Sequence, residues 1–508
     1  MTITDRAPVA GLSAAAGPGR ATAEVLRRRA RLAVLVSAQF VVMLDTSIVN
    51  VAVPSIQQDL GLTQTATAWV VNAYFLAFGG FLLLAGRAAD VVGRRGMFMV
   101  GSGLFTAATV VAGLSADQTV LVAARGLQGI GAAALSTAAL SILLVLAPGA
   151  ERAKAMAAWG AASTLGGATG VLAGGLTTAW LGWPWVFFLT VPVSLGALLA
   201  APYVLDRHMF TGARRGFDVR GAVAVTGAAL ALIYAVLSVA DHGWLSVQTL
   251  VGTGMSAALL LAFVRVERVS ADPLVPLVLF RSRSVSVGVV VGLLGGAARA
   301  STFFLVALYL QQVMLLEPAV AGVAMVPTSV VGFLVSMLVL PRVVRAFGPA
   351  RTLTLGLVIL GAGQLWLART PTGAGYRVDV LPGLVLAAVG VALSFTPSTM
   401  VVASAVPAPS TGLAAGMANA ASQIGAALGI SAFSAVAAVS SGGGLIGAAG
   451  AGGAASGLHA AFTVAALVAL FAALVAGRFL PPDGTPRPAG RVARIVTGRM
   501  VARPGHTL

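Results

Sequence analysis

The chain has 508 residues, of which 58% are hydrophobic and only 9% are charged, whereas charged residues make up about 25% of a typical soluble domain. It has no cysteine, which excludes disulfide bonds and thiolate metal sites. The net charge of +17 does not indicate nucleic-acid binding, because the arginines fall between long apolar runs and are explained by the orientation of a membrane protein.

Signatures of catalysis and of cofactor binding are absent from the sequence. The only lysine is Lys154, so no glycine-rich loop can end in the Lys-Ser/Thr pair that binds the phosphates of ATP. The four histidines form no pair at ligand spacing, and the sequence has no Ser/His/Asp grouping and no metal cluster. We therefore expect neither an enzyme, nor a metal site, nor a bound cofactor.

Apolar runs follow one another along the chain and predict an all-α integral membrane protein. An apolar helix needs about 20 residues to cross about 30 Å of hydrocarbon. By this measure we expect about fourteen spanning helices, near residues 32–54, 67–85, 97–115, 119–146, 154–180, 184–205, 219–240, 246–264, 285–313, 319–340, 352–369, 380–405, 412–438 and 459–480. The first run is too long for the core of a signal peptide, so we expect it to remain as the first helix.

The basic residues indicate the orientation. If the N-terminus is cytoplasmic, all but four of the 32 basic residues fall in cytoplasmic segments. Only Arg369 and Arg377 fall in outside loops, and Arg125 and Arg299 lie within spans. Because basic residues gather on the cytoplasmic side of membrane proteins, we expect an even number of crossings with both termini in the cytoplasm.

One carboxylate is expected deep inside a span. Of the 15 acidic residues, 14 fall in tails, loops or span ends, whereas Asp45 lies within the first apolar run. A charge at this depth costs about 2.5–3.5 kcal/mol, and loss of hydration favours the protonated form of a carboxyl group. Asp45 is therefore either a site of coupling to protons or to a cationic substrate, or a structural residue held by a buried arginine or by the hydroxyls of Thr46 and Ser47.

The two arginines within spans have several possible roles. Arg125 shares a helix face with Gln128 and Gly129, and Arg299 follows two glycines in the ninth span. Each could pair with Asp45, bind backbone carbonyls or face a water-filled cavity. For Arg299, a structural role and a contact with substrate are both open.

Small residues repeat every four positions on two helices. The fifth span has Gly166, Gly170 and Gly174, and the thirteenth has Gly412 and Gly416 followed by Asn419 and Gln423. Small residues at this spacing let helices pack closely in lipid. These stripes predict either fixed packing seams or surfaces along which helix bundles slide or bend.

Several segments carry recognisable motifs in a fixed order. They are LDTSIVNVAVP (44–54), GRAADVVGRR (86–95), RGLQGIGA (125–132), GGATGVLAGG (166–175), WPWVFFLTVP (183–192) and FDVRG (217–221). Together they resemble the major facilitator superfamily, and most of all its fourteen-helix drug–proton antiporter branch. The resemblance covers most of residues 30–480.

The resemblance implies a domain organisation. Two six-helix bundles are expected over 32–205 and 285–480, with two inserted helices over 219–264 and cytoplasmic tails over 1–31 and 481–508. Segment 341–351 is a degenerate counterpart of 86–95 that has lost the acidic residue, as expected of an internal duplication.

The resemblance also implies residue roles. Asp45 and Arg125 stand where the family has residues linked to proton coupling. The loop motif implies a conformational latch, and the fifth-helix motif is associated with export, although Val171 stands where that motif has proline. The gating residues so implied are Gly86, Asp90, Gly93, Arg94, Gly170, Gly174 and Gly175.

The function implied is proton-driven export of amphipathic small molecules, such as antibiotics or drugs, across the cytoplasmic membrane by alternating access. The proton motive force supplies the energy, and we expect a monomer in the lipid bilayer. Aromatic and amide groups suit such ligands, although each could instead bridge helices. The candidates to line the cavity are Asn50, Asn72, Tyr74, Arg299, Phe303, Tyr309, Gln312, Gln364, Asn419 and Gln423.

Two other classes of function stay open. The first is an exporter or importer of a specific metabolite, lipid or siderophore, which the substitution at Val171 keeps possible. The second is a membrane enzyme or sensory scaffold, for which the short tails offer no soluble domain.

Overall fold

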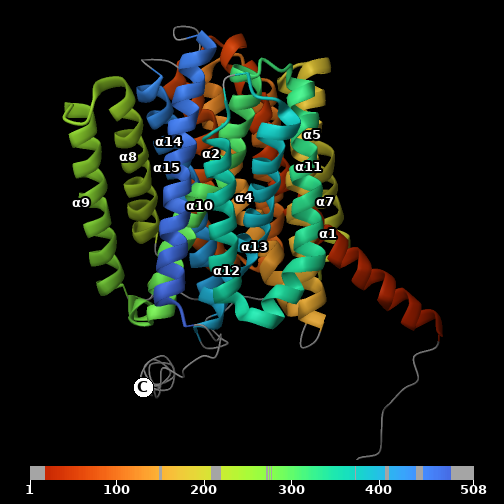
Figure 1. Ribbon diagram of the computed structural model, residues 1–508. Helices are drawn as coiled ribbons and strands as arrows, with labels where there is room; N and C mark the ends of the chain where they lie inside the picture. Colours follow the sequence, from red (N-terminus) through yellow and green to blue (C-terminus); the bar gives the residue numbers. More distant parts are fainter. Residues whose placement is uncertain are drawn as a thin grey trace, which may run out of the picture.

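The computed structural model describes residues 18–147, 151–206, 219–270, 273, 275, 277–371, 373–406, 411–441 and 450–481. All regular secondary structure in these ranges is helical, and none of these residues lies in a strand. Figure 1 shows most of the helices side by side, running along one common direction. The prediction of an all-α membrane protein is confirmed.

The first part of the chain, up to residue 206, forms seven helices. They are α1 (Pro18–Asp59), α2 (Gln64–Val92), α3 (Arg94–Gly113), α4 (Gln118–Leu146), α5 (Glu151–Leu181), α6 (Pro184–Phe188) and α7 (Val191–Val204). A pair follows, made of α8 (Val219–His242) and α9 (Val247–Val269).

The last part of the chain contains six α-helices and four short segments of other helix types. They are η2 (Leu277–Arg281), α10 (Arg283–Leu308), η3 (Tyr309–Val313), α11 (Pro318–Leu334), η4 (Val335–Val339), α12 (Leu340–Leu367), η5 (Tyr376–Val380), α13 (Leu381–Ser404), α14 (Thr411–Ser440) and α15 (Gly450–Phe479). Segment η2 is a 3-10 helix, and η3, η4 and η5 are π-helical.

Each predicted span overlaps one or two of these helices, and the differences lie at the ends and in how some spans are divided or joined. Helix α1 begins at Pro18, earlier than predicted, because the alanines and arginines before the apolar run also favour a helix. The sixth span is divided into α6 and α7, and Pro192 at the start of α7 has no N–H to continue the hydrogen-bond ladder.

Within the described ranges, ten continuous helical stretches are long and apolar enough to cross a membrane. One of them, Pro318–Leu367, has 50 residues and covers the predicted span 319–340 and most of 352–369. Gly348 interrupts it with a φ of 75°, a conformation that glycine adopts without strain. Two further apolar stretches, Ala66–Leu82 and Arg220–Val236, are shorter.

Two glycine seams bring pairs of helices into close contact. On α5, Gly170 and Gly174 lie against the backbone of α1 at Leu44 and Ile48. On α14, Gly425 and Gly429 lie against α10 in the same manner. The predicted seam on α5 is therefore a packing surface for the helix that carries Asp45.

The first seven helices and the last six meet chiefly along two lines. Helix α2 packs on α14, and α5 packs on α11. Asn72 Nδ2 donates to Ser431 Oγ at 2.7 Å, and Gly175 faces Gly322. Helix α8 lies beside α2 and α14, and α9, which packs on α8, is outermost in Figure 1.

Candidate functional site

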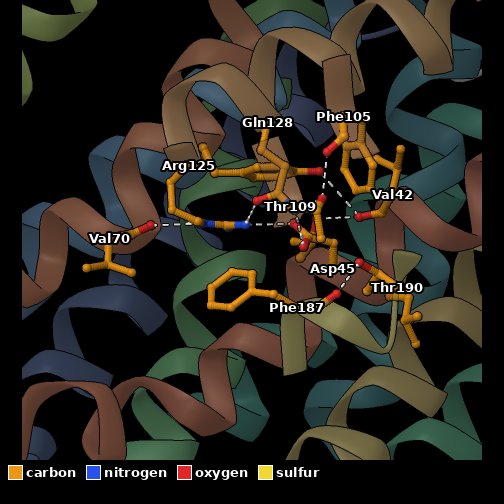
Figure 2. A network of polar contacts seen from close by, with 12 residues as sticks. Val42, Asp45, Val70, Phe105, Thr109, Arg125, Gln128, Phe187 and Thr190 are labelled. Carbon is orange, nitrogen blue, oxygen red and sulfur yellow. Dashed lines mark hydrogen bonds and ion pairs between the residues drawn. The ribbon is translucent and has the colours of Figure 1, made fainter. Parts of the chain in front are cut away.

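Asp45 lies at the centre of a buried network of polar side chains. Its exposed fraction is 0%, and apolar residues of α1 on either side of it belong to the core. Its Oδ2 accepts a hydrogen bond from Arg125 Nη1 at 2.8 Å. Its Oδ1 accepts from Gln128 Nε2 at 2.7 Å. Both carboxylate oxygens therefore have partners, and Figure 2 shows them converging.

Helix α4 supplies both partners from one face. Arg125 and Gln128 are three residues apart, and Arg125 Nη1 also donates to Gln128 Oε1 at 2.5 Å. The same Gln128 Nε2 donates to Thr109 Oγ1 of α3 at 2.8 Å, while Arg125 Nε donates to the carbonyl oxygen of Val70 in α2 at 3.2 Å. The network thus joins four helices.

Aromatic side chains cover the guanidinium. The Arg125 carbon Cζ lies 4.3 Å from the centre of the Tyr74 ring and 5.9 Å from that of Phe187. Arg125 itself is only 1% exposed. Few water molecules can therefore screen the ion pair, so its electrostatic interactions are stronger than those at a surface.

The structure distinguishes between the partners considered for Asp45. Arg125 is the arginine that pairs with it. The hydroxyls of Thr46 and Ser47 instead donate to backbone carbonyls of α1 one turn earlier. Thr109 belongs to the site but carried no signal in the sequence, because single threonines are common in apolar helices. Phe187 lies within the motif at 183–192, but the motif did not indicate which of its residues reach the ion pair.

This arrangement can respond to a proton. Removing one member of a buried ion pair leaves the other charge uncompensated, at a cost of about 3–5 kcal/mol. Protonation of Asp45 would have the same electrostatic effect on Arg125 as removing the carboxylate charge. A change in the charge of Asp45 would therefore alter the electrostatic energy of packing α1 against α4, and a change of this kind can bias a choice between two arrangements of helices.

The residues of the predicted latch lie around the junction of α2 and α3. Gly93 ends α2 and precedes α3 with a φ of 92°, which favours glycine. Gly86 is half-buried in α2, and Arg94 begins α3. The side chain of Asp90 lies outside the described residues, so its predicted pairing stays a prediction.

The predicted cavity residues are divided between several sites. Tyr74 covers the Asp45 network, and Asn72 bonds across to α14. Asn50 lies five residues after Asp45 on α1, and its Oδ1 has no hydrogen-bond partner. Gln364 Nε2 donates to Thr302 Oγ1 at 2.7 Å.

The other candidates lie on or near α10 and α14. The amide of Gln312 is without partners in η3, where the ring of Tyr309 lies 6.1 Å from that of His459. Phe303 packs against the core. Gln423 and Asn419 lie one turn apart on α14, and Gln423 faces Gly79 of α2.

Comparison with known proteins identifies the family. The Major Facilitator Superfamily model matches residues 35–430. The puromycin resistance protein of Streptomyces alboniger is 38% identical over 81% of this chain and 82% of its own length. The cephamycin export protein of Amycolatopsis lactamdurans is 35% identical over 78% of this chain and 82% of its own length.

Solved structures agree on the fold. The crystal structure of a D-xylose–proton symporter covers 91% of this chain and 99% of its own, with a TM-score of 0.63 at 15% sequence identity. The family model and the relatives together span most of the chain, including the Asp45 network. The chain therefore belongs to the Major Facilitator Superfamily and is a multi-pass membrane transporter rather than an enzyme.

Proposed function

We propose that the protein exports amphipathic small molecules, such as antibiotics, across the cell membrane in exchange for protons. The relatives that support export are named for resistance to puromycin, for resistance to and export of tetracenomycin C, and for export of cephamycin. Each of them aligns with more than two thirds of this chain. Because these names refer to different drugs, they support a broad class of substrate, antibiotics, rather than one particular compound.

The observation that carries proton coupling is the Asp45 network. A carboxylate with an exposed fraction of 0%, held by one guanidinium and one amide, combines a group that can bind a proton with partners that respond to its charge. In the proposed cycle, protonated Asp45 releases Arg125 and favours one arrangement of the helices, and the drug favours the other. Tyr74 and Phe187 keep the pair away from water in the arrangement described.

Alternating access is the proposed mechanism. Helices α1–α7 and α10–α15 would rock as two bundles about the lines where α2 meets α14 and α5 meets α11. Gly175 and the α2–α3 latch would then lie at opposite ends of the moving interface. We propose that both termini are cytoplasmic, that α8–α9 form an inserted pair, and that the monomer is the working unit.

The energy of one proton is sufficient for this task. A charge that moves down a potential of about 100 mV supplies about 2.3 kcal/mol. At one-to-one exchange with a neutral drug, this corresponds to a concentration ratio of about fiftyfold.

The test is the accumulation of puromycin in an efflux-deficient bacterial host. We expect the wild type to lower accumulation several-fold, an uncoupler to abolish this effect, and Asp45→Asn to behave like the empty vector at equal membrane levels. Normal export by Asp45→Asn would contradict coupling through Asp45. If the wild type does not lower the accumulation of any drug in a broad panel, the proposal of drug export is wrong. A specific metabolite would then be the favoured substrate.

A further inference from the structure

A second guanidinium, that of Arg299 on α10, is buried among the helices of the last part of the chain. Its exposed fraction is 5%. Its Nη2 donates to Ser422 Oγ of α14 at 3.0 Å, whereas its Nη1 is buried without a hydrogen-bond partner. No carboxylate among the described residues forms an ion pair with it, in contrast to Arg125, which has Asp45.

A glycine face of α10 makes room for this side chain. A Cβ atom on Gly295 would lie 2.7 Å from Arg299 Nη1. One turn earlier, a Cβ atom on Gly292 would lie 3.5 Å from Ser398 Oγ of α13. The Ser398 hydroxyl is 3% exposed and also has no partner. Two unpartnered polar groups from two helices therefore lie over the same glycine face.

The unsatisfied groups indicate the charge of their missing partner. A guanidinium has only donors, and a hydroxyl can donate as well as accept. Burial of an unpaired charge is costly, and hydrogen bonds to an oppositely charged acceptor are about twice as strong as neutral ones. The kind of partner that suits each of these two groups is an anionic oxygen.

We propose that Arg299 and Ser398 bind an anionic group of the transported substrate, foremost a carboxylate. The inference rests on the proposed export function and adds that amphipathic acids are among its substrates. Ser422 is a positioning residue, because its Oγ holds Nη2 and leaves Nη1 directed elsewhere. The ring of Phe395, whose centre is 5.8 Å from Arg299 Cζ, would lie beside the apolar part of such a ligand.

The test compares two nearly isosteric probes on the purified full-length protein. One is a fluorescent coumarin carboxylic acid and the other is its uncharged carboxamide, and binding is measured by fluorescence titration. We expect the wild type to bind the acid about tenfold or more tightly than the amide, as for loss of a charged hydrogen bond. We expect Arg299→Gln to lose this preference by weakening the acid alone, and Arg299→Lys to retain part of it.

Controls separate this role from a structural one. Arg369→Gln, which removes an exposed arginine just after the end of α12, should keep the preference for the acid. Arg299→Gln should melt no lower than the wild type, because it removes an unpaired buried charge. The proposal would be overturned if Arg299→Gln melted at a lower temperature than the wild type and bound the acid and the amide more weakly to the same extent. Equal binding of the two probes by the wild type would also overturn it.

The source of the anion is tested separately with sodium acetate. If acetate raises the melting temperature of the wild type but not of Arg299→Gln, and the wild type shows no preference for the acid probe, Arg299 binds a free anion and the substrate assignment is overturned. Failure of the export proposal is a different result, because puromycin accumulation would then be the same with the wild type and the empty vector.

Discussion

At the scale of single residues, the charge of Asp45 depends on two neighbours on α4. Arg125 Nη1 lies 2.8 Å from Asp45 Oδ2 and balances the carboxylate charge, and Gln128 Nε2 donates to Asp45 Oδ1 at 2.7 Å. The sequence could predict that Asp45 and Arg125 have a structural or functional role, because each is a charge inside an apolar run. It could not tell which arginine pairs with Asp45, since that depends on how helices distant in sequence pack together.

The ion pair predicts a strong non-additivity of substitutions. Arg125→Gln should lower the free energy of unfolding by about 3–5 kcal/mol, because it leaves a buried carboxylate uncompensated. The double variant Asp45→Asn/Arg125→Gln should lose less than the sum of the two single variants. Thermal unfolding in detergent measures this, with Arg369→Gln as a control outside the network. Additive losses would contradict a direct pair.

At the scale of elements, the glycine seam of α5 positions the carboxylate. A Cβ atom on Gly170 would lie 2.6 Å from the carbonyl oxygen of Leu44, the residue before Asp45. The four-residue spacing predicted a packing face on α5, but it contained no information about which helix packs there. Helix α5 is continuous from Glu151 to Leu181, and Val171 lies within it.

The seam predicts different effects for two neighbouring glycines. Gly170→Ala should displace α1 from α5, lower stability by about 1–3 kcal/mol through overpacking, and reduce transport, because α1 carries Asp45. Gly167→Ala is the matched control, since a Cβ atom there meets nothing within 4 Å. Thermal unfolding and puromycin accumulation measure both variants. Equal behaviour of the two alanine variants would contradict this role for the seam.

At the scale of the whole molecule, hydropathy could predict the spans but not their arrangement. Every predicted span overlaps a helix because each needs enough apolar length to cross the bilayer. The ends shifted where polar residues such as those after Pro18 continue a helix, and where Pro192 interrupts one. The contacts between the two helix sets, such as Gly175 with Gly322, depend on tertiary packing, which leaves no local pattern.

In the proposed cycle, proton exchange at Asp45 drives drug transport. It implies a thermodynamic linkage, because a drug and a proton that favour opposite arrangements must weaken each other's binding. The linkage can be observed as protons released when the drug binds, without any membrane potential.

The most direct measurement is therefore proton release by the purified protein on addition of puromycin, followed with a pH indicator in weakly buffered solution across a pH series. We expect the wild type to release up to about one proton per drug molecule bound over a limited pH range. We expect Asp45→Asn to bind puromycin without releasing protons. Equal proton release by Asp45→Asn and the wild type would contradict coupling at Asp45.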